Sequence, residues 1–258
     1  MLAGAVAGVP VRTHTFTGQV WATRSGMGRA LLKTADKIIA GLATSLIVDS
    51  PSQRRFLIEQ KVLSQEKSRV LCQGSISGVD TVRFRPDREA RAEVRCRLGI
   101  PEDAVVFLFL GRLNRDKGVA DLARAFALLA AVNAKAQLLL VGPDEENLRP
   151  EIRGLCSSCG DRVHFVDFAA SPEMYMASAD VFCLPSYREG FGSVLIEAAA
   201  AGVAAVATRI YGITDAVEDG QTGLLYNAGD TGQLADRMRI LLNAPAQYLI
   251  SLPSAGEI

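Results

Sequence analysis

The chain has 258 residues, of which 49% are hydrophobic and 22% are charged, and its formal net charge is zero. This length permits one large domain or two small ones, and the hydrophobic share is ample for a packed core. No apolar run reaches the roughly 18 residues of a membrane-spanning helix, and we expect no nucleic-acid partner.

The charges are unevenly distributed along the chain. Up to Asp80 there are ten Lys and Arg against five Asp and Glu, whereas from Thr81 onward there are eighteen against twenty-three. Two segments of opposite charge suggest two surfaces with different partners.

The first segment alternates strands with helices. The predicted elements are a strand at 10–16, a helix at 28–41, a strand at 45–48, a helix at 52–60 and a strand at 68–72. Glycines, serines and a proline between 74 and 86 predict a linker. A charged helix at 88–98 follows and should end at Gly99, where a left-handed cap costs little.

The second segment repeats the alternation more regularly. Strands are predicted at 105–110, 137–141, 162–166, 181–184, 203–207 and 223–226, and helices at 119–131, 145–156, 172–177, 192–201, 215–218 and 231–242. The strand at 105–110 is apolar at every position, as a buried parallel strand must be. The pattern predicts an α/β fold with a mostly parallel sheet.

In such a sheet, ligands bind at the carboxyl ends of the strands. After the strand at 105–110 come Gly111, which allows close approach, and two cations, Arg112 and Lys117. After the strand at 181–184 come Glu189, a Gly-Phe-Gly turn and, in the next helix, Glu197. Free amides at a helix start suit phosphate, and carboxylates accept hydrogen bonds from sugar hydroxyls. Together these features indicate a pocket for a nucleotide bonded to a sugar.

Three motifs in this order carry a family resemblance. They are Gly-Arg-Leu…Lys-Gly at 111–118, Pro-Ser-x-x-Glu-Gly-Phe-Gly-x4-Glu-Ala at 185–198 and Gly-x-Thr-Gly-Leu-Leu at 220–225. From about Pro10 to Pro245 the chain resembles the bacterial retaining glycosyltransferases of the GT-B fold, family four. The resemblance implies a partial, acceptor-side Rossmann-like domain at 1–80 and a complete, donor-binding Rossmann-like domain at 81–258.

The resemblance also implies roles for individual residues. Arg112, Lys117 and Glu189 are the implied catalytic residues: the two cations hold the donor diphosphate, and Glu189 grips the hydroxyls of a hexose. Glu197 holds the ribose. The other implied substrate-binding residues are Gly111, Asp167, Phe168, Gly190, Phe191, Gly192 and Ser193, with Asp167 and Phe168 bordering the base. No Asp-x-Asp pair is present, so no metal and no cofactor is expected, and the nucleotide-diphosphate sugar, UDP-linked, is a substrate.

Each assignment has a simpler alternative. Arg112 and Lys117 could be a solvated helix start, and Glu189 could merely stabilise a helix dipole by under ~1 kcal/mol. Glu197 stands in an apolar helix and should be buried or cleft-facing, where a carboxylate needs a partner. At the level of function, a non-catalytic remnant that binds nucleotide-sugar and a GT-B-like epimerase remain alternatives to a transferase. A dinucleotide enzyme would need a Gly-x-Gly-x-x-Gly motif that the chain lacks.

The chain departs from the family pattern in several places. Many relatives have a histidine where this chain has Thr17, so a catalytic histidine cannot be transferred, and His14 is only a cleft candidate. His164 is predicted to be a satisfied core residue. The chain opens inside an expected helix at 1–8, and 249–258 lacks a helical period, so a truncated enzyme is expected.

Two further expectations concern location. Five scattered cysteines, including the pair Cys156 and Cys159, give no disulfide or zinc framework and fit a reducing cytosol. Arg29, Lys33 and Lys37 recur on one face of a predicted helix. They could attach the protein peripherally to the inner membrane, near a lipid-linked or polysaccharide acceptor, or form an ordinary solvated face.

Overall fold

The structure is a computed structural model that describes residues 1–243 as two compact units. The first unit comprises 1–78 together with Arg188–Ser193 and Ile210–Ala216. The second comprises Val79–Tyr187, Val194–Arg209 and the chain from Val217 onward. The predicted tail at 249–258 lies outside the described residues. The roles of acceptor-side and donor-binding domain stay predictions.

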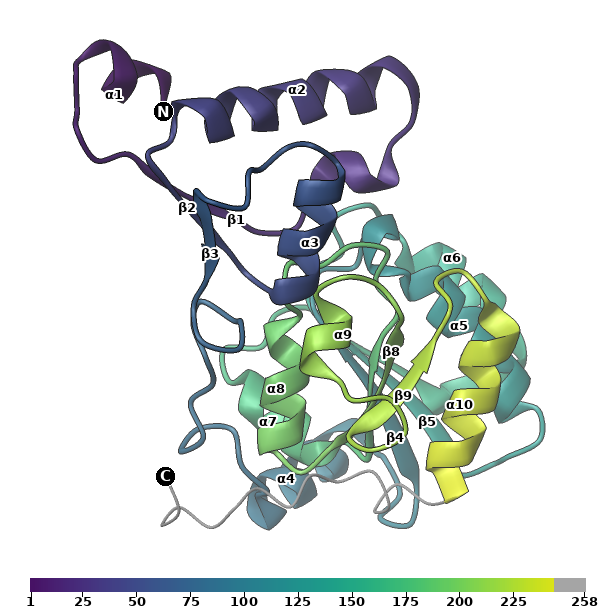
Figure 1. Cartoon of the computed structure of the whole chain (residues 1–258). Helices are drawn as coiled ribbons and strands as arrows, with labels where there is room; N and C mark the ends of the chain where they lie inside the picture. Colours follow the sequence, from purple (N-terminus) through teal and green to yellow (C-terminus); the bar gives the residue numbers. More distant parts are fainter. Residues whose placement is uncertain (244–258) are drawn as a thin grey trace. The chain divides into compact units, whose positions relative to one another are not determined.

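The first unit contains a three-stranded parallel sheet (Figure 1). Its strands follow chain order: β1 (Thr13–Phe16), β2 (Ser45–Val48) and β3 (Ser68–Val70). The helices of this unit are α1 (Leu2–Val6), the 3-10 turn η1 (Val20–Thr23), α2 (Gly26–Leu42), α3 (Pro51–Glu59) and α9 (Ile213–Ala216). The buried core comprises Phe16, Trp21, Ala40, Ala43, Leu46, Val48, Leu57, Val62 and Leu63. The predicted parallel arrangement of this segment is confirmed.

Local chemistry explains where the elements of this unit begin. Ser50 caps α3 by accepting the N–H of Gln53, and Pro51 occupies the first turn, so α3 starts one residue before its predicted start. The strand predicted from residue 10 begins only at Thr13, because the Arg12 N–H donates to the Thr44 hydroxyl instead of a strand partner (2.8 Å).

The second unit is built on a six-stranded parallel sheet (Figure 1). Its strands are β4 (Val105–Leu110), β5 (Ala136–Val141), β6 (Val163–Val166), β7 (Val181–Leu184), β8 (Ala204–Thr208) and β9 (Gly223–Tyr226). Their spatial order is β6-β5-β4-β7-β8-β9. The chain therefore winds outward in one direction from β4 and in the other from β7. This topological switch point between β4 and β7 is where open parallel sheets bind ligands.

Helices pack against both faces of this sheet. The helices are α4 (Arg88–Leu98), α5 (Val119–Ala130), α6 (Arg149–Leu155), α7 (Pro172–Ser178), α8 (Ser193–Ala200) and α10 (Thr231–Asn243), with 3-10 turns η2 (Arg115–Lys117) and η3 (Ser157–Arg162). One core cluster joins α5, α6 and α10 to alternate residues of the strands, including Phe107, Phe109, Leu138 and Leu140. Alternation places these four side chains on one face of the sheet.

Two helix ends test the predicted boundaries. As predicted, α4 ends at Gly99, which is left-handed (φ 66°, ψ 27°). In contrast, α6 starts at Arg149 and not at residue 145. Asn147 has a positive φ of 53°, and the Asp144 carboxylate accepts the N–H groups of Leu148 and Arg149. A side chain thus takes the donors that a longer helix would have used.

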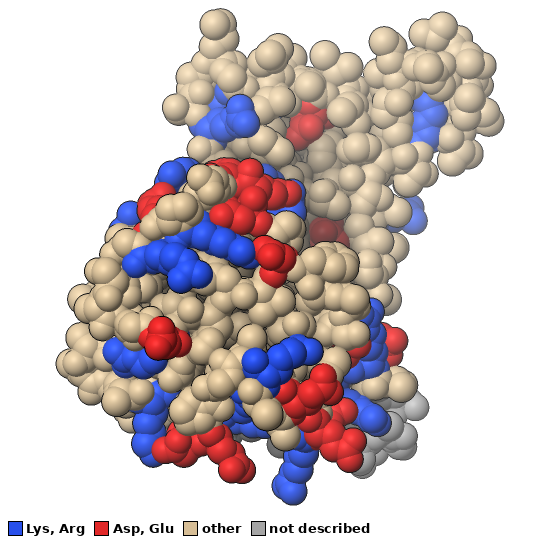
Figure 2. All heavy atoms as spheres, turned by 180° about the vertical axis from the view of Figure 1, so that it is seen from behind, with Lys and Arg blue, Asp and Glu red and all other residues tan. Residues whose placement is uncertain are grey.

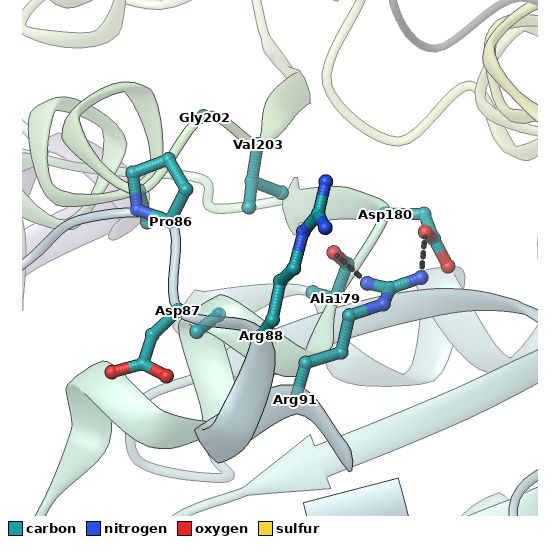
Figure 3. Close-up of a pocket in the computed structure, with 10 residues that line it drawn as sticks. Pro86, Asp87, Arg88, Arg91, Ala179, Asp180, Gly202 and Val203 are labelled. Carbon is teal, nitrogen blue, oxygen red and sulfur yellow. Dashed lines mark hydrogen bonds and ion pairs between the residues drawn. The ribbon is translucent and has the colours of Figure 1, made fainter. Parts of the chain in front are cut away.

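A buried ion pair joins α4 to the sheet at its amino-terminal edge. Arg95 is 4% exposed and donates to Asp180 at 2.7 Å and to the carbonyl oxygens of Ser178 and Ala104. Figure 3 shows Arg91 donating to Asp180 and to the carbonyl of Ala179, beside a pocket of about 250 Å³. None of the predicted site residues lines this pocket.

None of the helices within residues 1–243 has the length and apolar character that a membrane span requires. On the face seen in Figure 2, basic and acidic side chains are interspersed rather than gathered into one surface of a single sign. This mixture matches the zero net charge of the chain.

Candidate functional site

Residues 111–118, called the cation loop below, leave β4 at the switch point of the six-stranded sheet. The loop runs alongside the segment after β5: the Leu113 N–H donates to the Pro143 carbonyl (2.8 Å), and the Glu145 N–H donates to the Leu113 carbonyl (3.1 Å). Asn114 is 7% exposed and caps η2 by accepting the Lys117 N–H (3.1 Å). The loop is thus fixed by main-chain contacts.

Two glycines let neighbouring connections approach closely. Gly142 has φ 140°, and a side chain there would overlap the Gly111 carbonyl group, whose carbon would lie 2.7 Å from the added Cβ. Gly118 has φ 67°, and an added Cβ would overlap the Pro185 carbonyl in the same way. The ends of β4, β5 and β7 therefore converge, as predicted from the rule for parallel sheets.

The segment after β7 is held against the cation loop. The Tyr187 N–H donates to the Asp116 carbonyl (2.8 Å), and the Tyr187 hydroxyl donates to Asp121 in the first turn of α5 (2.6 Å). This bond raises the pKa of Tyr187 to about 12. The Thr208 hydroxyl, at the end of β8, donates to the Ser186 carbonyl (2.6 Å). Three strand ends are thereby joined at one edge.

Arg112 and Lys117 both lie in this loop. The Arg112 side chain is 57% exposed and pairs with Glu145, with Nη1 3.3 Å from Oε1. Asn114 donates to the same carboxylate (3.0 Å) and, together with Arg112, lowers the pKa of Glu145. Lys117 is half-buried within η2. Sequence reasoning missed Asn114 and Glu145, whose contacts depend on how two loops meet.

Asp167 and Phe168 follow β6 at the same edge of the sheet. Asp167 is exposed and pairs with Arg149 of α6 at 2.5 Å, while Phe168 is 78% exposed. Arg149 also lies over the Phe165 ring, 5.3 Å from its centroid. The geometry leaves Phe168 available for stacking, but its role toward a base stays a prediction.

Glu197 lies in the middle of α8 and is half-buried. Burial raises its pKa, and the nearby Arg83 partly offsets this. Among residues 1–243, no side chain or amide donates a hydrogen bond to its carboxylate, and Arg83 instead pairs with Glu173 at 2.8 Å. A half-buried carboxylate without a hydrogen-bond donor is suited to receive hydroxyl groups from a ligand.

Residues 189–193, called the acidic turn below, belong to the first unit. Phe191 is 7% exposed, and its ring lies against Gly74, where an added Cβ would come within 2.8 Å of Cε2. The hydroxyls of Ser193 and Ser75 lie 3.4 Å apart. Glu189 is half-buried. The structure thus gathers all the predicted residues from Glu189 to Ser193 into one unit, while Glu197 belongs to the other.

The acidic turn packs on main chain from other parts of the first unit. A Cβ added at Gly212 would lie 2.6 Å from the Gly190 carbonyl oxygen, and one added at Gly18 would lie 3.4 Å from the Gly190 nitrogen. Asp49 is also here, with Oδ2 2.6 Å from the position of a Cβ on Gly190. Sequence reasoning missed Gly18, Gly212 and Asp49 as partners of the turn. The one sequence signal that could have selected these three residues is that each lies in the connection after a strand.

The histidine predictions hold only in part: His164 has a hydrogen-bond partner as predicted, but it is half-buried on the edge strand β6 and does not belong to the core. His164 donates to or accepts from Gln137 on the neighbouring strand (2.9 Å), and burial lowers its pKa. His14 lines a pocket of about 250 Å³ with residues 15–21 and Asp36, and burial lowers its pKa although Asp36 opposes this. The structure assigns His14 no catalytic contact, so it stays a cleft candidate.

Within the described residues, the cysteines and the possible metal ligands form neither a disulfide nor a metal-ion site. All five cysteines are free thiols, and Cys156, Cys159 and Cys183 are buried. Burial raises the pKa of Cys156 to about 12. Across the part of the chain that the structure describes, no three His, Cys, Asp or Glu side chains are grouped to hold a metal ion. Metal independence stays a prediction.

The basic residues of α2 are not equally exposed. Arg29 and Lys33 lie over the Trp21 ring, 5.3 and 5.4 Å from its centroid, and Lys33 donates to Gln60 (2.8 Å). Lys37 is exposed. Large apolar side chains of α2 are exposed as well: Met27 at 88%, Leu31 at 71% and Ile38 at 56%.

Solved structures share this fold. HepE from Anabaena, in a complex with UDP and glucose, matches with a TM-score of 0.80 and 22% identity, covering 96% of this chain and 69% of its own. Sucrose-phosphate synthase from Thermosynechococcus elongatus matches with a TM-score of 0.75 and 30% identity, covering 92% of this chain and 59% of its own. The fold is that of the GT-B glycosyltransferases, as the sequence resemblance predicted.

The sequence comparisons identify the family. Glycosyl transferases group 1 matches residues 104–244, which is more than half of the chain. The chain belongs to this family. Among its relatives are the capsular polysaccharide biosynthesis glycosyltransferase CapM of Staphylococcus aureus, at 30% identity over 91% of this chain, and the D-inositol 3-phosphate glycosyltransferase of Arthrobacter sp. (strain FB24), at 33% identity over 81%. The chain spans 61% and 50% of the lengths of these two relatives.

Proposed function

We propose that the chain binds a UDP-linked sugar at the carboxyl-terminal edge of the six-stranded sheet and transfers its hexose, with retention and without a metal, to a polysaccharide or lipid-linked acceptor. The observation that carries this proposal is the switch point between β4 and β7, where the cation loop meets Pro185 through Gly118. The presence of UDP and glucose in the HepE complex supports the choice of donor, and the similarity to CapM, a glycosyltransferase of capsular polysaccharide biosynthesis, supports the choice of a polysaccharide acceptor.

The proposed chemistry depends on charge at the leaving group. Breaking the bond between sugar and diphosphate leaves negative charge on the diphosphate, and fixed cations stabilise it more in the transition state than in the ground state. Arg112 and Lys117 would supply that charge. Arg112 is now paired with Glu145, but exposed pairs contribute only about 0–1 kcal/mol. A diphosphate could therefore displace Glu145 at little cost.

The carboxylates would recognise hydroxyl groups. Glu197, half-buried and without a hydrogen-bond donor among the described residues, would accept hydrogen bonds from the ribose. Glu189 and the amides of Gly190, Phe191 and Gly192 would hold the hexose. Ionised carboxylates accept hydrogen bonds from hydroxyl groups, and the amide N–H groups donate to hydroxyl oxygens.

The decisive experiment is calorimetry of the purified chain with UDP and with UDP-glucose, followed by an assay for sugar transfer or donor hydrolysis. We expect both ligands to bind and UDP-sugar to be consumed. The second candidate is a protein that binds the nucleotide-sugar without transferring it, and donor binding without any turnover would favour it. Failure to bind either ligand at millimolar concentration would refute both.

We further propose peripheral membrane contact through α2, where Lys37 and the exposed Met27, Leu31 and Ile38 combine charge with apolar surface. Replacing Arg29, Lys33 and Lys37 by Gln should reduce sedimentation with liposomes that contain anionic lipid. Because Arg29 and Lys33 contact Trp21, the single change Lys37→Gln should account for much of the loss. Unchanged sedimentation of the triple variant would exclude this surface.

A further inference from the structure

The pocket of Figure 3 lies at the amino-terminal edge of the six-stranded sheet, whereas the cation loop leaves the carboxyl-terminal edge. The start of α4 and the connections that lead into β7 and β8 form its walls. All ten residues that line the pocket belong to the second unit. None of them is among the residues proposed to bind the sugar donor, so the pocket has no assigned role.

Arg88 supplies the pocket with a cation that lacks a partner. Its side chain is exposed, and Figure 3 shows it extending across the pocket toward Val203. Among residues 1–243, no carboxylate pairs with its guanidinium and no carbonyl accepts a hydrogen bond from it. Arg88 is also the first residue of α4, where the positive end of the helix dipole disfavours a cation. An anion beside Arg88 would relieve this repulsion.

The two acids of the pocket are engaged by other groups. Asp180 pairs with Arg91 at 2.6 Å and with Arg95 at 2.7 Å. The Asp87 carboxylate caps α4 by accepting two N–H groups of its first turn, each at 3.0 Å. Figure 3 shows Asp87 turned away from the Arg88 guanidinium. Neither acid therefore neutralises Arg88, although both would repel a ligand with a large negative charge.

Main-chain N–H groups around the pocket also have partners. Gly202 and Val203 donate to carbonyl groups of α8, at 3.0 and 2.9 Å, and the Asp180 N–H donates to the Val106 carbonyl at 3.0 Å. These three amides are thus not available to a ligand. The Arg88 guanidinium, which is exposed, can donate to one.

The rest of the wall is apolar and tightly packed. It is formed by Pro86, Ala177, Ala179, Ala201 and Val203. The Pro86 ring lies against Gly202, where an added Cβ would come within 3.3 Å of its Cγ. The volume of 250 Å³ is that of about eight water molecules in the liquid. A ligand that fills the pocket is therefore small, and part of it is apolar.

These features select one kind of anion. A planar carboxylate matches the fork of donors on a guanidinium group, and its single negative charge matches the single unpaired cation. A phosphate is favoured where several main-chain amides are free to donate, and here the three amides named above are engaged. A doubly charged ligand would also lie close to Asp87 and Asp180.

We propose that this pocket binds a small monocarboxylic acid whose carboxylate pairs with Arg88 and whose short branched hydrocarbon part packs between Pro86 and Val203. The pocket is a second ligand site of the second unit, distinct from the proposed donor site at the other edge of the sheet. The inference does not depend on sugar transfer.

The test is an NMR titration of the full chain with isovalerate, which carries one carboxylate and a branched hydrocarbon part. We expect saturable shifts of backbone amide signals within 87–91, 177–180 and 201–203. The neutral analogue 3-methylbutanol should bind at least tenfold more weakly, because it lacks the charge. Acetate should bind several-fold more weakly, because it buries less apolar surface. Inorganic phosphate should give no saturable shift of these signals.

Arg88→Gln removes the charge and keeps a polar side chain at an exposed position. We expect it to weaken isovalerate binding at least tenfold. The melting temperature of the unliganded variant should not fall, because the substitution removes a cation from the positive end of α4. Arg85→Gln is the matched control, since Arg85 is an exposed arginine three residues earlier that does not line the pocket. It should bind isovalerate as the parent does.

Several results would overturn the inference. If Arg88→Gln binds isovalerate as tightly as the parent, or if Arg85→Gln weakens binding as much, Arg88 is an ordinary solvated cation. Equal affinities for isovalerate and 3-methylbutanol would mean that no carboxylate is recognised. Tighter binding of phosphate at the same signals would make the site a phosphate site. If isovalerate gives no saturable shift, the pocket is not a ligand site. Each of these outcomes is separate from the results with UDP and UDP-glucose.

Discussion

The cation loop is assembled from connections at one edge of a single sheet, whereas the acidic turn is packed by segments from four distant parts of the chain. In the first case, neighbouring strands of the sheet deliver Gly111, Gly142 and Pro185 to one place. In the second, β1, β2, the linker and the segment after β8 all contribute. Sheet topology fixes the cation loop almost completely, while the acidic turn depends on tertiary packing.

The largest effect should come from filling the close approach in the cation loop. Gly142→Ala combines a φ of 140° with overlap of the Gly111 carbonyl, so we expect it to lower the free energy of unfolding by about 3–5 kcal/mol. Denaturant unfolding measures this. Gly154→Ala in α6 is the control, because a Cβ at this position would meet nothing within 4 Å. This substitution should stabilise the helix by up to about 1 kcal/mol. Equal stabilities for the two variants would contradict the close approach.

Removing one charge from each region should separate their roles. Lys117→Ala and Glu189→Ala should each cost about 2–4 kcal/mol in sugar transfer, the scale of one preorganised electrostatic contact. Lys117→Ala should also weaken the binding of UDP itself, whereas Glu189→Ala should weaken only the binding of UDP-sugars. Calorimetry and transfer rates of both variants test this. Transfer at the parent rate in both would mean that the assigned site is wrong.

The smallest effect concerns the pH dependence of stability. Burial raises the pKa of Asp49, so its ionised form opposes folding at pH values above the folded-state pKa. Asp49→Asn should therefore be more stable than the parent at pH 7. Because Asp49 is only half-buried, solvent screening limits the gain to under about 1 kcal/mol.

This gain should shrink as the pH falls and disappear below the ordinary Asp pKa of 3.8, where the carboxyl group is neutral in both the folded and the unfolded chain. Thermal unfolding from pH 4 to pH 8 measures the difference. A gain that is constant across this range would mean that the charge of Asp49 is not its cause.

Sequence patterns predicted the second unit in detail. The bounds of β4, β7, β9 and α4 agree with the predicted ranges because buried strands and a glycine-capped helix leave local signals. The start of α6 was wrong because the Asp144 carboxylate takes amides that a helix would use, which is a competition that composition does not reveal.

The sites were predictable to different degrees. Arg112 and Lys117 could be placed at the sheet edge by topology alone. Asp49 could not be selected, because its relevance depends on contact with Gly190 and on the charge of Glu189, both remote in sequence. The contacts of Asn114 and Glu145 were missed for the same reason. Predicted ligand roles at both sites stay predictions.

The discontinuity of the first unit has a practical consequence. Because Arg188–Ser193 and Ile210–Ala216 form one compact unit with residues 1–78, expressing 81–258 alone would remove neighbours of these two segments. The Phe191 ring would lose its packing contact with Gly74. Asp215 would lose the hydrogen bond that its carboxylate accepts from the Ser52 N–H (2.9 Å). Domain exchange with a relative would therefore need to transfer these two segments together with the first 78 residues, so that the glycines at 18, 74 and 212 keep their close contacts with the acidic turn.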